Sequence, residues 1–105
     1  MIEIIRARVS TPEQLAQLAE EAIELAHAAL KVRRALGISN PTPVSLSAAL
    51  AKLEEELADV LLCLEVLGFE FRDRAKRRAL IDDTIDFKMK RWVDRLEAVE
   101  KGGES

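Results

Sequence analysis

Four acidic residues in two predicted helical segments have the spacing of metal ligands. Glu21 and Glu24 are three residues apart, and Glu56 and Asp59 repeat that spacing further along the chain. Residues three apart are neighbours on a helix surface, so each pair presents two carboxylates on one side of its helix. Asp59 also interrupts the apolar run 57–67, where a carboxylate is costly unless its charge is compensated.

A basic side chain, protonation or a metal ion could compensate these charges. Four carboxylates that converge from two antiparallel helices carry a summed charge near −4, which one lysine or protonation offsets poorly. Hard divalent cations prefer carboxylate and water oxygens, and Mg²⁺ binds together with substrate phosphates. The pattern therefore predicts a Mg²⁺ site for a phosphorylated ligand. A solvated acidic face, paired with surface Lys and Arg, is the alternative, and it is the better explanation of Glu21 and Glu24 considered alone.

The first acidic pair lies in a predicted helix of about 25 residues. Thr11 can cap its start, Pro12 suits the first helical position, and Gln14 stands where a capping box has Glu or Gln. Gly37 ends the helix. The preceding residues, Met1–Val9, could form a short extension or an extra turn.

The second acidic pair lies in a predicted helix that Ser45 or Ser47 caps and that runs to Gly68. Residues 38–43 contain two prolines and form a loop, and this short connection predicts an antiparallel helical hairpin. From Leu57 onward the second helix is apolar nearly all round, which is typical of a buried helix.

A third helix is expected from about Leu80 to Val99, after the charged stretch Glu70–Arg78, which either joins it or precedes a kink. The tail 101–105 should fray. We therefore expect an all-α protein in which an antiparallel helical hairpin and a third helix form a bundle that homodimerisation completes. The 105 residues make a single domain, residues 1–105, with a core from about 12 to 99.

Composition excludes several classes of protein. Hydrophobic residues make up 49% of the chain, but a domain this small leaves much apolar surface exposed, so self-association is expected. The formal net charge of −3 argues against a nucleic-acid-binding protein. The single cysteine excludes an internal disulfide framework, and no apolar run reaches the roughly 18 residues of a membrane span. Because the start of the chain lacks the apolar core of a secretory signal, we expect a cytoplasmic protein.

Two segments of the sequence together resemble a known family. Residues 18–26, LAEEAIELA, and residues 53–61, LEEELADVL, are similar to the EExxE…ExxD signature of MazG-like nucleotide pyrophosphohydrolases, in the all-α nucleoside triphosphate pyrophosphatase superfamily. The resemblance extends from about Gln14 to Leu96, and its two halves are specific jointly. The segment Lys88–Trp92 and the Asn-Pro-Thr-Pro loop also look like small bacterial and phage members.

The resemblance implies a helical fold that forms a dimer or a tetramer. It also implies an enzyme that hydrolyses (deoxy)nucleoside triphosphates to monophosphate and pyrophosphate with Mg²⁺, or with Mn²⁺ in its place. Glu20 matches the leading acid of the signature, and Lys88 falls where the family often has a phosphate-contacting Lys or Asn. Four positions match the family's metal ligands: Glu21, Glu24, Glu56 and Asp59.

A mechanism follows from this chemistry. Mg²⁺ bridges phosphate oxygens and lowers the pKa of a bound water, and Glu24 or Glu20 could orient that water or accept its proton. Attack then separates monophosphate from pyrophosphate, while basic side chains stabilise the developing charge. The candidates for this substrate-binding role are Lys31, Lys88, Arg91 and Arg95.

Two other functions remain open from the residues alone. A helical interaction or regulatory module without catalysis could keep the acidic pattern for folding. Glu24 and His27 also have the E-x-x-H spacing of di-iron carboxylate bundles, although Asp59 would then have no role. His27 points about 60° away from Glu24 on a helical wheel, so we expect it at the surface or at an interface.

Three further features have structural as well as functional explanations. Cys63 is expected as a small buried hydrophobic residue. The basic run Arg72–Arg78 could grip a triphosphate or a nucleic acid, but a solvated surface is the commoner reason for such a run. Trp92 could stack on a base, but its helical spacing from Ile85 and Leu96 favours a place in the core or at a dimer interface.

Overall fold

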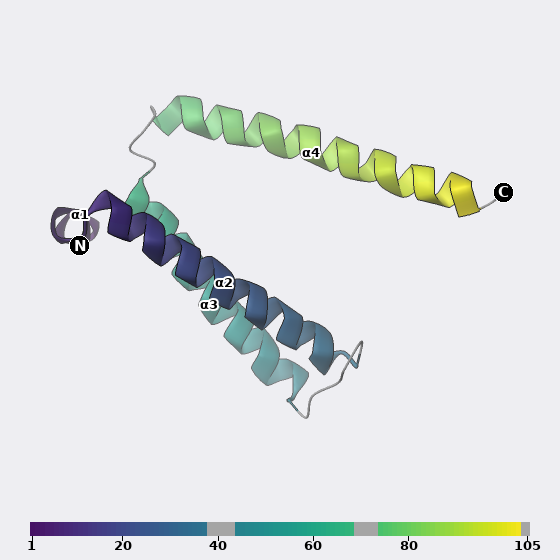
Figure 1. The fold of residues 1–105 in the computed structure, drawn as a ribbon, viewed down its shortest axis with the longest axis horizontal. Helices are drawn as coiled ribbons and strands as arrows, with labels where there is room; N and C mark the ends of the chain where they lie inside the picture. Colours follow the sequence, from purple (N-terminus) through teal and green to yellow (C-terminus); the bar gives the residue numbers. More distant parts are fainter. Residues whose placement is uncertain (38–43, 69–73, 104–105) are drawn as a thin grey trace. The chain divides into compact units, whose positions relative to one another are not determined.

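The computed structural model describes residues 1–37, 44–68 and 74–103, and every regular element in these ranges is an α-helix (Figure 1). The helices are α1 (Ile2–Arg8), α2 (Thr11–Ala35), α3 (Leu46–Leu67) and α4 (Arg74–Gly103). The all-α class predicted from the sequence is thereby confirmed. The chain divides into two compact units, Met1–Gly68 and Phe69–Ser105, and a single domain over residues 1–105 stays a prediction.

The start of α2 is capped one residue earlier than the sequence predicts. Ser10 is the N-cap, and its hydroxyl oxygen accepts a hydrogen bond of 3.3 Å from the backbone N–H of Glu13. Thr11 is the first helical residue, so the prediction of Thr11 as the cap is wrong. Gln14 is buried, and its Nε2 donates to the carbonyl of Val9 over 2.9 Å. This side chain therefore closes the junction between α1 and α2 instead of completing a capping box.

The other helix ends follow their local sequence signals. Gly37, just beyond α2, has a φ of 82°, a left-handed conformation that glycine adopts without a steric penalty. Ser45 caps α3, and its hydroxyl oxygen accepts a hydrogen bond of 3.1 Å from the backbone N–H of Ala48. Gly68 ends α3 with a φ of 59°. The predicted boundaries of the second helix are thus confirmed, whereas the loop predicted over residues 38–43 lies outside the described residues.

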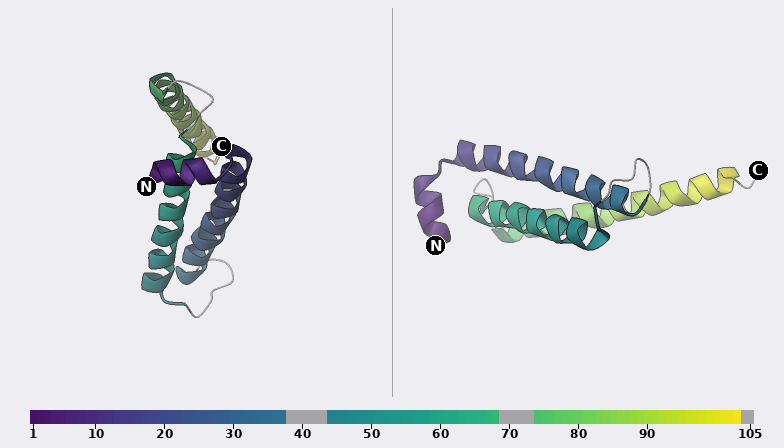
Figure 2. Two further views of the ribbon diagram at one scale, coloured as in Figure 1. Left: turned by 90° about the vertical axis from the view of Figure 1, so that its left-hand side faces the viewer. Right: turned by 90° about the horizontal axis from the view of Figure 1, so that it is seen from below.

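The segment before α2 forms a helix of its own, α1, and Arg6 of this helix is bonded to the end of α3. The Arg6 Nε donates to the carbonyl of Val66 and its Nη2 donates to the carbonyl of Glu65, both over 2.7 Å. The last carbonyls of a helix have no partners within it, and the helix dipole is negative at that end. Arg6 satisfies two of these carbonyls and so holds α1 across one end of the α2–α3 pair (Figure 2).

The helices α2 and α3 lie side by side and run in opposite directions (Figures 1 and 2). The hydrophobic residues buried in this unit are Ala28, Ala49, Val66 and Leu67. Two helices share only one face, so other apolar side chains of α3 stay on the surface. Leu57 is 45%, Leu61 is 56% and Leu62 is 52% exposed. The prediction that the second helix is buried nearly all round from Leu57 onward is therefore wrong within this unit.

The helix α4, in the second unit, is longer than the pattern predicts. It runs from Arg74 to Gly103, whereas the apolar periodicity predicts about Leu80 to Val99. Residues 74–78 of the basic run belong to the helix, and so do residues 101–103 of the tail that is predicted to fray. The rest of the basic run and of the tail lies outside the described residues.

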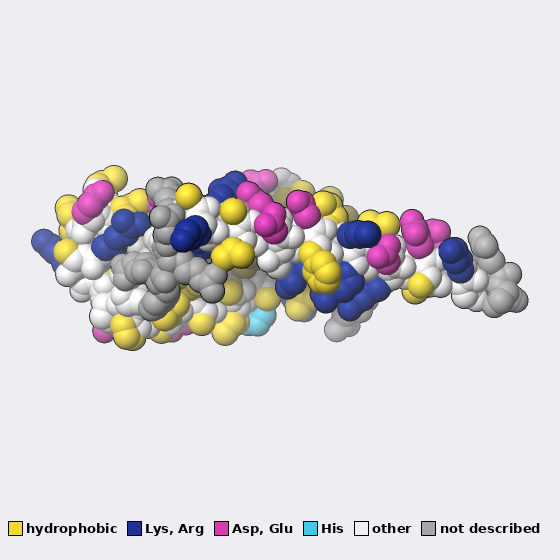
Figure 3. Space-filling model, turned by 90° about the horizontal axis from the view of Figure 1, so that it is seen from above, with side chains coloured by type: hydrophobic (Ala, Val, Ile, Leu, Met, Phe, Trp, Pro, Cys, Tyr) yellow, Lys and Arg dark blue, Asp and Glu magenta, His cyan; other side chains and the backbone are white. Residues whose placement is uncertain are grey.

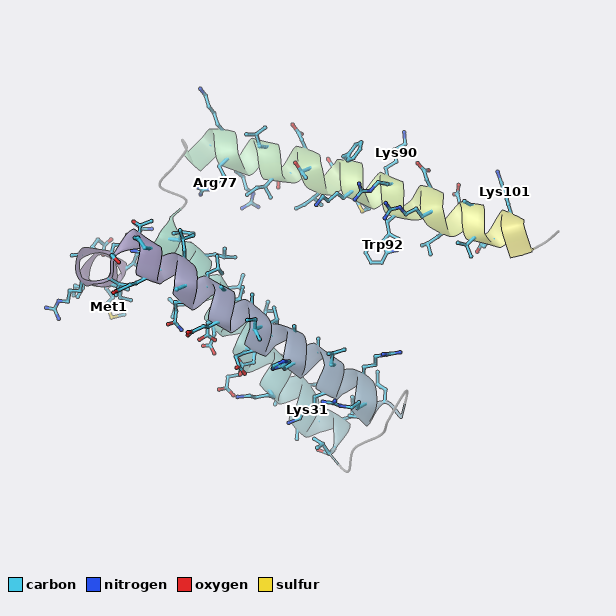
Figure 4. All side chains as sticks on the ribbon, in the orientation of Figure 1. Met1, Lys31, Arg77, Lys90, Trp92 and Lys101 are labelled. Carbon is cyan, nitrogen blue, oxygen red and sulfur yellow. The ribbon has the colours of Figure 1, made fainter. Side chains whose placement is uncertain are left out.

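Charged and apolar side chains are mixed along α4, and nearly all of those that the structure describes are exposed (Figures 3 and 4). Trp92 projects from the helix and is 68% exposed, so it is not a core residue of this unit (Figure 4). Its place at a dimer interface stays a prediction. Among the helices of the described ranges, none combines the length and the apolar character that crossing a membrane requires.

Candidate metal centre

Three of the four predicted metal ligands meet between α2 and α3. Glu21 of α2 and Glu56 and Asp59 of α3 each offer a carboxylate oxygen, and these oxygens all lie within 4.8 Å of one another. Glu56 is buried, whereas Glu21 and Asp59 are half-buried. We call these three residues the carboxylate cluster.

A side chain one turn earlier on each helix contacts a member of the carboxylate cluster. Gln17 Nε2 donates to Glu21 Oε1 over 2.8 Å, and Lys52 Nζ lies 2.9 Å from Glu56 Oε1. The hydrogen bond to Glu56, followed by the charge of Glu55, raises the pKa of the Lys52 ammonium. Both contacts join residues four apart, which are neighbours on a helix surface. They fix the orientation of two of the three carboxylates.

The carboxylate cluster keeps a negative charge after its lysine is counted. Three ionised carboxylates carry −3 and Lys52 supplies +1, which leaves −2. A divalent cation would balance that charge, and carboxylate oxygens are the hard ligands that Mg²⁺ and Mn²⁺ prefer. The donor set therefore fits a Mg²⁺ ion that keeps further coordination positions for water and phosphate.

The fourth predicted ligand, Glu24, is not part of this group. Its side chain is exposed, and among the described residues the carboxylates that converge come from Glu21, Glu56 and Asp59. Three of the four predicted ligands thus converge in this structure, and Glu24 as a fourth ligand stays a prediction.

Glu20 and Lys31 lie outside the carboxylate cluster on the same helix. Glu20 is exposed and lines a cavity next to the cluster. Lys31 is exposed and stands ten residues after Glu21, which corresponds to about 15 Å along the helix axis (Figure 4). That distance keeps Lys31 from the cluster itself, so its predicted contact would be with a distant part of a substrate.

The remaining predicted cations, Lys88, Arg91 and Arg95, are exposed on α4 in the second unit. The guanidinium carbon of Arg91 lies 5.9 Å from the centre of the Phe87 ring, within the range of a cation–π interaction. Their predicted contact with phosphate stays a prediction.

A cavity of about 460 Å³ opens between α1, α2 and α3. This volume lies within the range of roughly 300–1,000 Å³ that small-molecule sites occupy. We call it the α1–α2–α3 cavity. The residues that line it are Ile5 and Val9 of α1, Glu13, Gln14, Ala16, Gln17 and Glu20 of α2, and Leu62, Cys63 and Val66 of α3.

Cys63 is half-buried and lines the α1–α2–α3 cavity, whereas the sequence predicts a small buried hydrophobic residue. Burial raises the pKa of its thiol, and the negative charges of Glu21 and Asp59 raise it further. A raised thiol pKa lowers the fraction of the nucleophilic thiolate at neutral pH. Cys63 is therefore not an activated nucleophile.

His27, the one histidine of the chain, is exposed on α2 and is the cyan side chain of Figure 3. It does not join Glu21, Glu56 and Asp59 in the group that the described part of the chain forms. A di-iron carboxylate site needs imidazole among its carboxylates. The expected surface position agrees with the structure, and the geometry gives the di-iron alternative no support.

Sequence reasoning missed the partners of the carboxylate cluster and the cavity beside it. Gln17 stands four residues before Glu21, and Lys52 stands four residues before Glu56, a spacing at which helical side chains interact. That signal is present in the sequence and could have been used. The cavity depends on the helix α1, which the sequence does not distinguish from a short extension.

Comparisons of the chain with models of known protein families, with curated proteins and with solved structures gave no match. The resemblance to MazG-like nucleotide pyrophosphohydrolases therefore rests on the two sequence segments that carry it, and it enters below as support for a proposal.

Proposed function

We propose that this protein is a Mg²⁺-dependent nucleoside triphosphate pyrophosphohydrolase, which converts a (d)NTP and water to a (d)NMP and pyrophosphate. The observation that carries the proposal is the meeting of Glu21, Glu56 and Asp59 between two helices. The EExxE…ExxD pattern supports it as well, because the two segments that resemble the family signature are the ones that supply the carboxylate cluster.

In this proposal the carboxylate cluster holds Mg²⁺, or Mn²⁺ in its place. Gln17 keeps the carboxylate of Glu21 in a fixed orientation, as outer partners of metal ligands do. A bound Mg²⁺ supplies Lewis-acid stabilisation of phosphate oxygens and makes a bound water more acidic.

Glu20 and Glu24 are proposed to act on the attacking water. Both are exposed on α2 close to Glu21, and neither is occupied in the carboxylate cluster, so a carboxylate of one of them can accept the proton of the water. Attack breaks a phosphoanhydride bond, and negative charge develops on the departing pyrophosphate. The basic side chains proposed to stabilise that charge are Lys31, Lys88, Arg91 and Arg95.

We further propose a cytoplasmic homodimer, or a tetramer, in which α2 and α3 act as a hairpin that pairs with a second copy and α4 completes the bundle. The unit Met1–Gly68 buries few hydrophobic side chains, while Leu57, Leu61 and Leu62 are about half exposed. Burying these side chains against a second copy would supply the apolar contact that so small a unit lacks.

Product analysis tests the proposed activity. The purified protein is incubated with a panel of (d)NTPs and Mg²⁺, and monophosphate and pyrophosphate are expected in equal amounts. Asp59→Asn should lower turnover by about 100-fold or more because it removes a ligand. Glu54→Gln is the matched control, since Glu54 is an exposed carboxylate of the same helix outside the cluster. Release of orthophosphate, or absence of turnover at every Mg²⁺ and Mn²⁺ concentration, would contradict the proposal.

A helical interaction module without catalysis is the second candidate. The exposed apolar side chains of α3 and of α4, such as Leu61 and Trp92, favour it, because apolar surface of this kind marks sites of protein association. Such a module would bind its partner without a divalent cation and would leave nucleotides intact. Nucleotide hydrolysis that requires the carboxylate cluster would exclude it as the sole function.

A further inference from the structure

The α1–α2–α3 cavity and the carboxylate cluster are neighbours. Gln17 lines the cavity and donates the 2.8 Å hydrogen bond to Glu21 of the cluster. Cys63 lines the cavity as well, and Glu21 and Asp59 lie close enough for their charges to act on its thiol. A ligand whose phosphates lie at the cluster can therefore extend another part of itself into the cavity.

The cavity suits an uncharged ring and not a phosphate group. Among the described residues that line it there is no Lys, Arg or His, whereas Glu13 and Glu20 contribute carboxylates. These charges repel phosphate, and apolar walls favour the flat face of an organic ring. The apolar side chains that form these walls are Ile5, Val9, Ala16, Leu62 and Val66.

Three polar side chains that line the cavity follow one face of α2, and Gln14, which also lines it, is buried. Glu13, Gln17 and Glu20 are separated by four and three residues, so they are successive neighbours along the helix. An ionised carboxylate only accepts hydrogen bonds. A ring that donates through an amino group is therefore matched by this face, whereas a ring with a carbonyl oxygen at the same edge is repelled.

We propose that the α1–α2–α3 cavity binds the nucleobase of the substrate, and that Glu13 selects a base with an exocyclic amino group. Cytosine, adenine and guanine carry such a donor, whereas uracil and thymine carry carbonyl oxygens and no amino group. The inference rests on the proposed hydrolase function, because it assigns the triphosphate to the carboxylate cluster. It adds the class of substrate, which the cluster does not determine.

The pair dCTP and dUTP tests the inference, because cytosine has an amino group and a bare ring nitrogen where uracil has a carbonyl oxygen and a ring N–H. We expect kcat/KM for dCTP to exceed that for dUTP by about tenfold, the effect of one hydrogen bond to a charged acceptor. Calorimetric binding of dCMP and dUMP, with no turnover, should show the same preference.

Two variants locate the selectivity in the cavity. Glu13→Gln should reduce the ratio of dCTP to dUTP kcat/KM, because an amide donates as well as accepts, and Glu54→Gln should keep the ratio. Ala16→Trp places bulk in the cavity and should weaken dCMP binding without changing Mn²⁺ binding. Ala26→Trp, at an exposed position of α2 that does not line the cavity, is its control.

The outcomes separate this inference from the proposed function. Equal kcat/KM for dCTP and dUTP together with equal binding of dCMP and dUMP would overturn the inference while the hydrolase stands. A change of oligomeric state in Ala16→Trp with unaltered dCMP binding would also overturn it, since a second copy would then fill the cavity. Absence of pyrophosphate from every triphosphate would overturn the hydrolase, whereas selective dCMP binding would still support the cavity as a base site.

Discussion

Lys52 and Glu56 form an ion pair of 2.9 Å on α3, in which the Glu56 side chain is 7% and the Lys52 side chain 51% exposed. The pair places one positive charge on a carboxylate of the cluster, so a divalent cation bound there would compete with Lys52 for Glu56. Lys52 therefore stabilises the metal-free protein and competes with the metal.

Lys52→Met tests this competition. Without divalent cations the variant should unfold at a lower temperature than the wild type, because Glu56 then lies near two other carboxylates without a compensating charge. Added Mn²⁺ should raise the Tm of the variant by more than that of the wild type, since binding to the folded state stabilises it. Differential scanning calorimetry measures both effects, and an equal Mn²⁺ response in the two proteins would contradict the account.

Gln17→Leu tests the second outer contact of the cluster. Leucine keeps the size of the side chain but loses the 2.8 Å hydrogen bond that holds Glu21. We expect Mn²⁺ affinity to fall by about 10-fold to 100-fold, the usual effect of removing such a partner. Calorimetric titration gives the affinity, and circular dichroism checks that the helices are retained. Affinity equal to the wild type would show that Glu21 needs no orientation by Gln17.

Gly68→Ala tests how α1 is held to α3. The φ of 59° disfavours alanine, and a Cβ at this position would lie 2.7 Å from Arg6 Nη2, so we expect a loss of about 1–2 kcal/mol in the free energy of unfolding. Gly37→Ala is the control, because Gly37 has a φ of 82° and open space around its Cβ position. When Arg6 is replaced by Met, Gly68→Ala and Gly37→Ala should lower the free energy of unfolding by the same amount. Urea unfolding measures these free energies. If Gly68→Ala remains more destabilising than Gly37→Ala in the Arg6→Met protein, the close contact of residue 68 with Arg6 is disproved.

The reactivity of Cys63 reports the charge of the cluster. Its thiol pKa is raised by burial and then by Glu21 and Asp59, so the rate of alkylation by iodoacetamide should rise with pH to a midpoint above that of an ordinary cysteine. Asp59→Asn removes one negative charge and should shift the midpoint to lower pH, because the thiolate then becomes easier to form. Glu54→Gln should leave the pH midpoint of alkylation unchanged. A midpoint that Asp59→Asn does not move would place Cys63 away from the cluster.

The helix boundaries could be predicted where one local signal dominates. Ser45 and Gly68 enclose α3 as expected, since a capping hydroxyl and a left-handed glycine act on adjacent residues. At the start of α2 two adjacent residues, Ser10 and Thr11, offer the same hydroxyl chemistry, and the sequence does not decide between them.

The candidate site could be predicted only as far as single helices allow. A helical wheel places Glu21 and Glu24 on one side of their helix, but it contains no information on the register between two helices. That register brings Glu21 to Glu56 and Asp59 and leaves Glu24 exposed. The cavity requires three helices at once, and for this reason no periodicity of the sequence indicates it.

The most direct test of the central claim is the binding of Mn²⁺, followed by electron paramagnetic resonance of the free ion during titration. We expect that the wild type and Glu54→Gln remove free Mn²⁺ from solution, and that Asp59→Asn and Glu56→Gln largely lose this capacity while remaining helical. Equal Mn²⁺ binding by all four proteins, or no binding by the wild type, would contradict the claim that Glu21, Glu56 and Asp59 form a metal site.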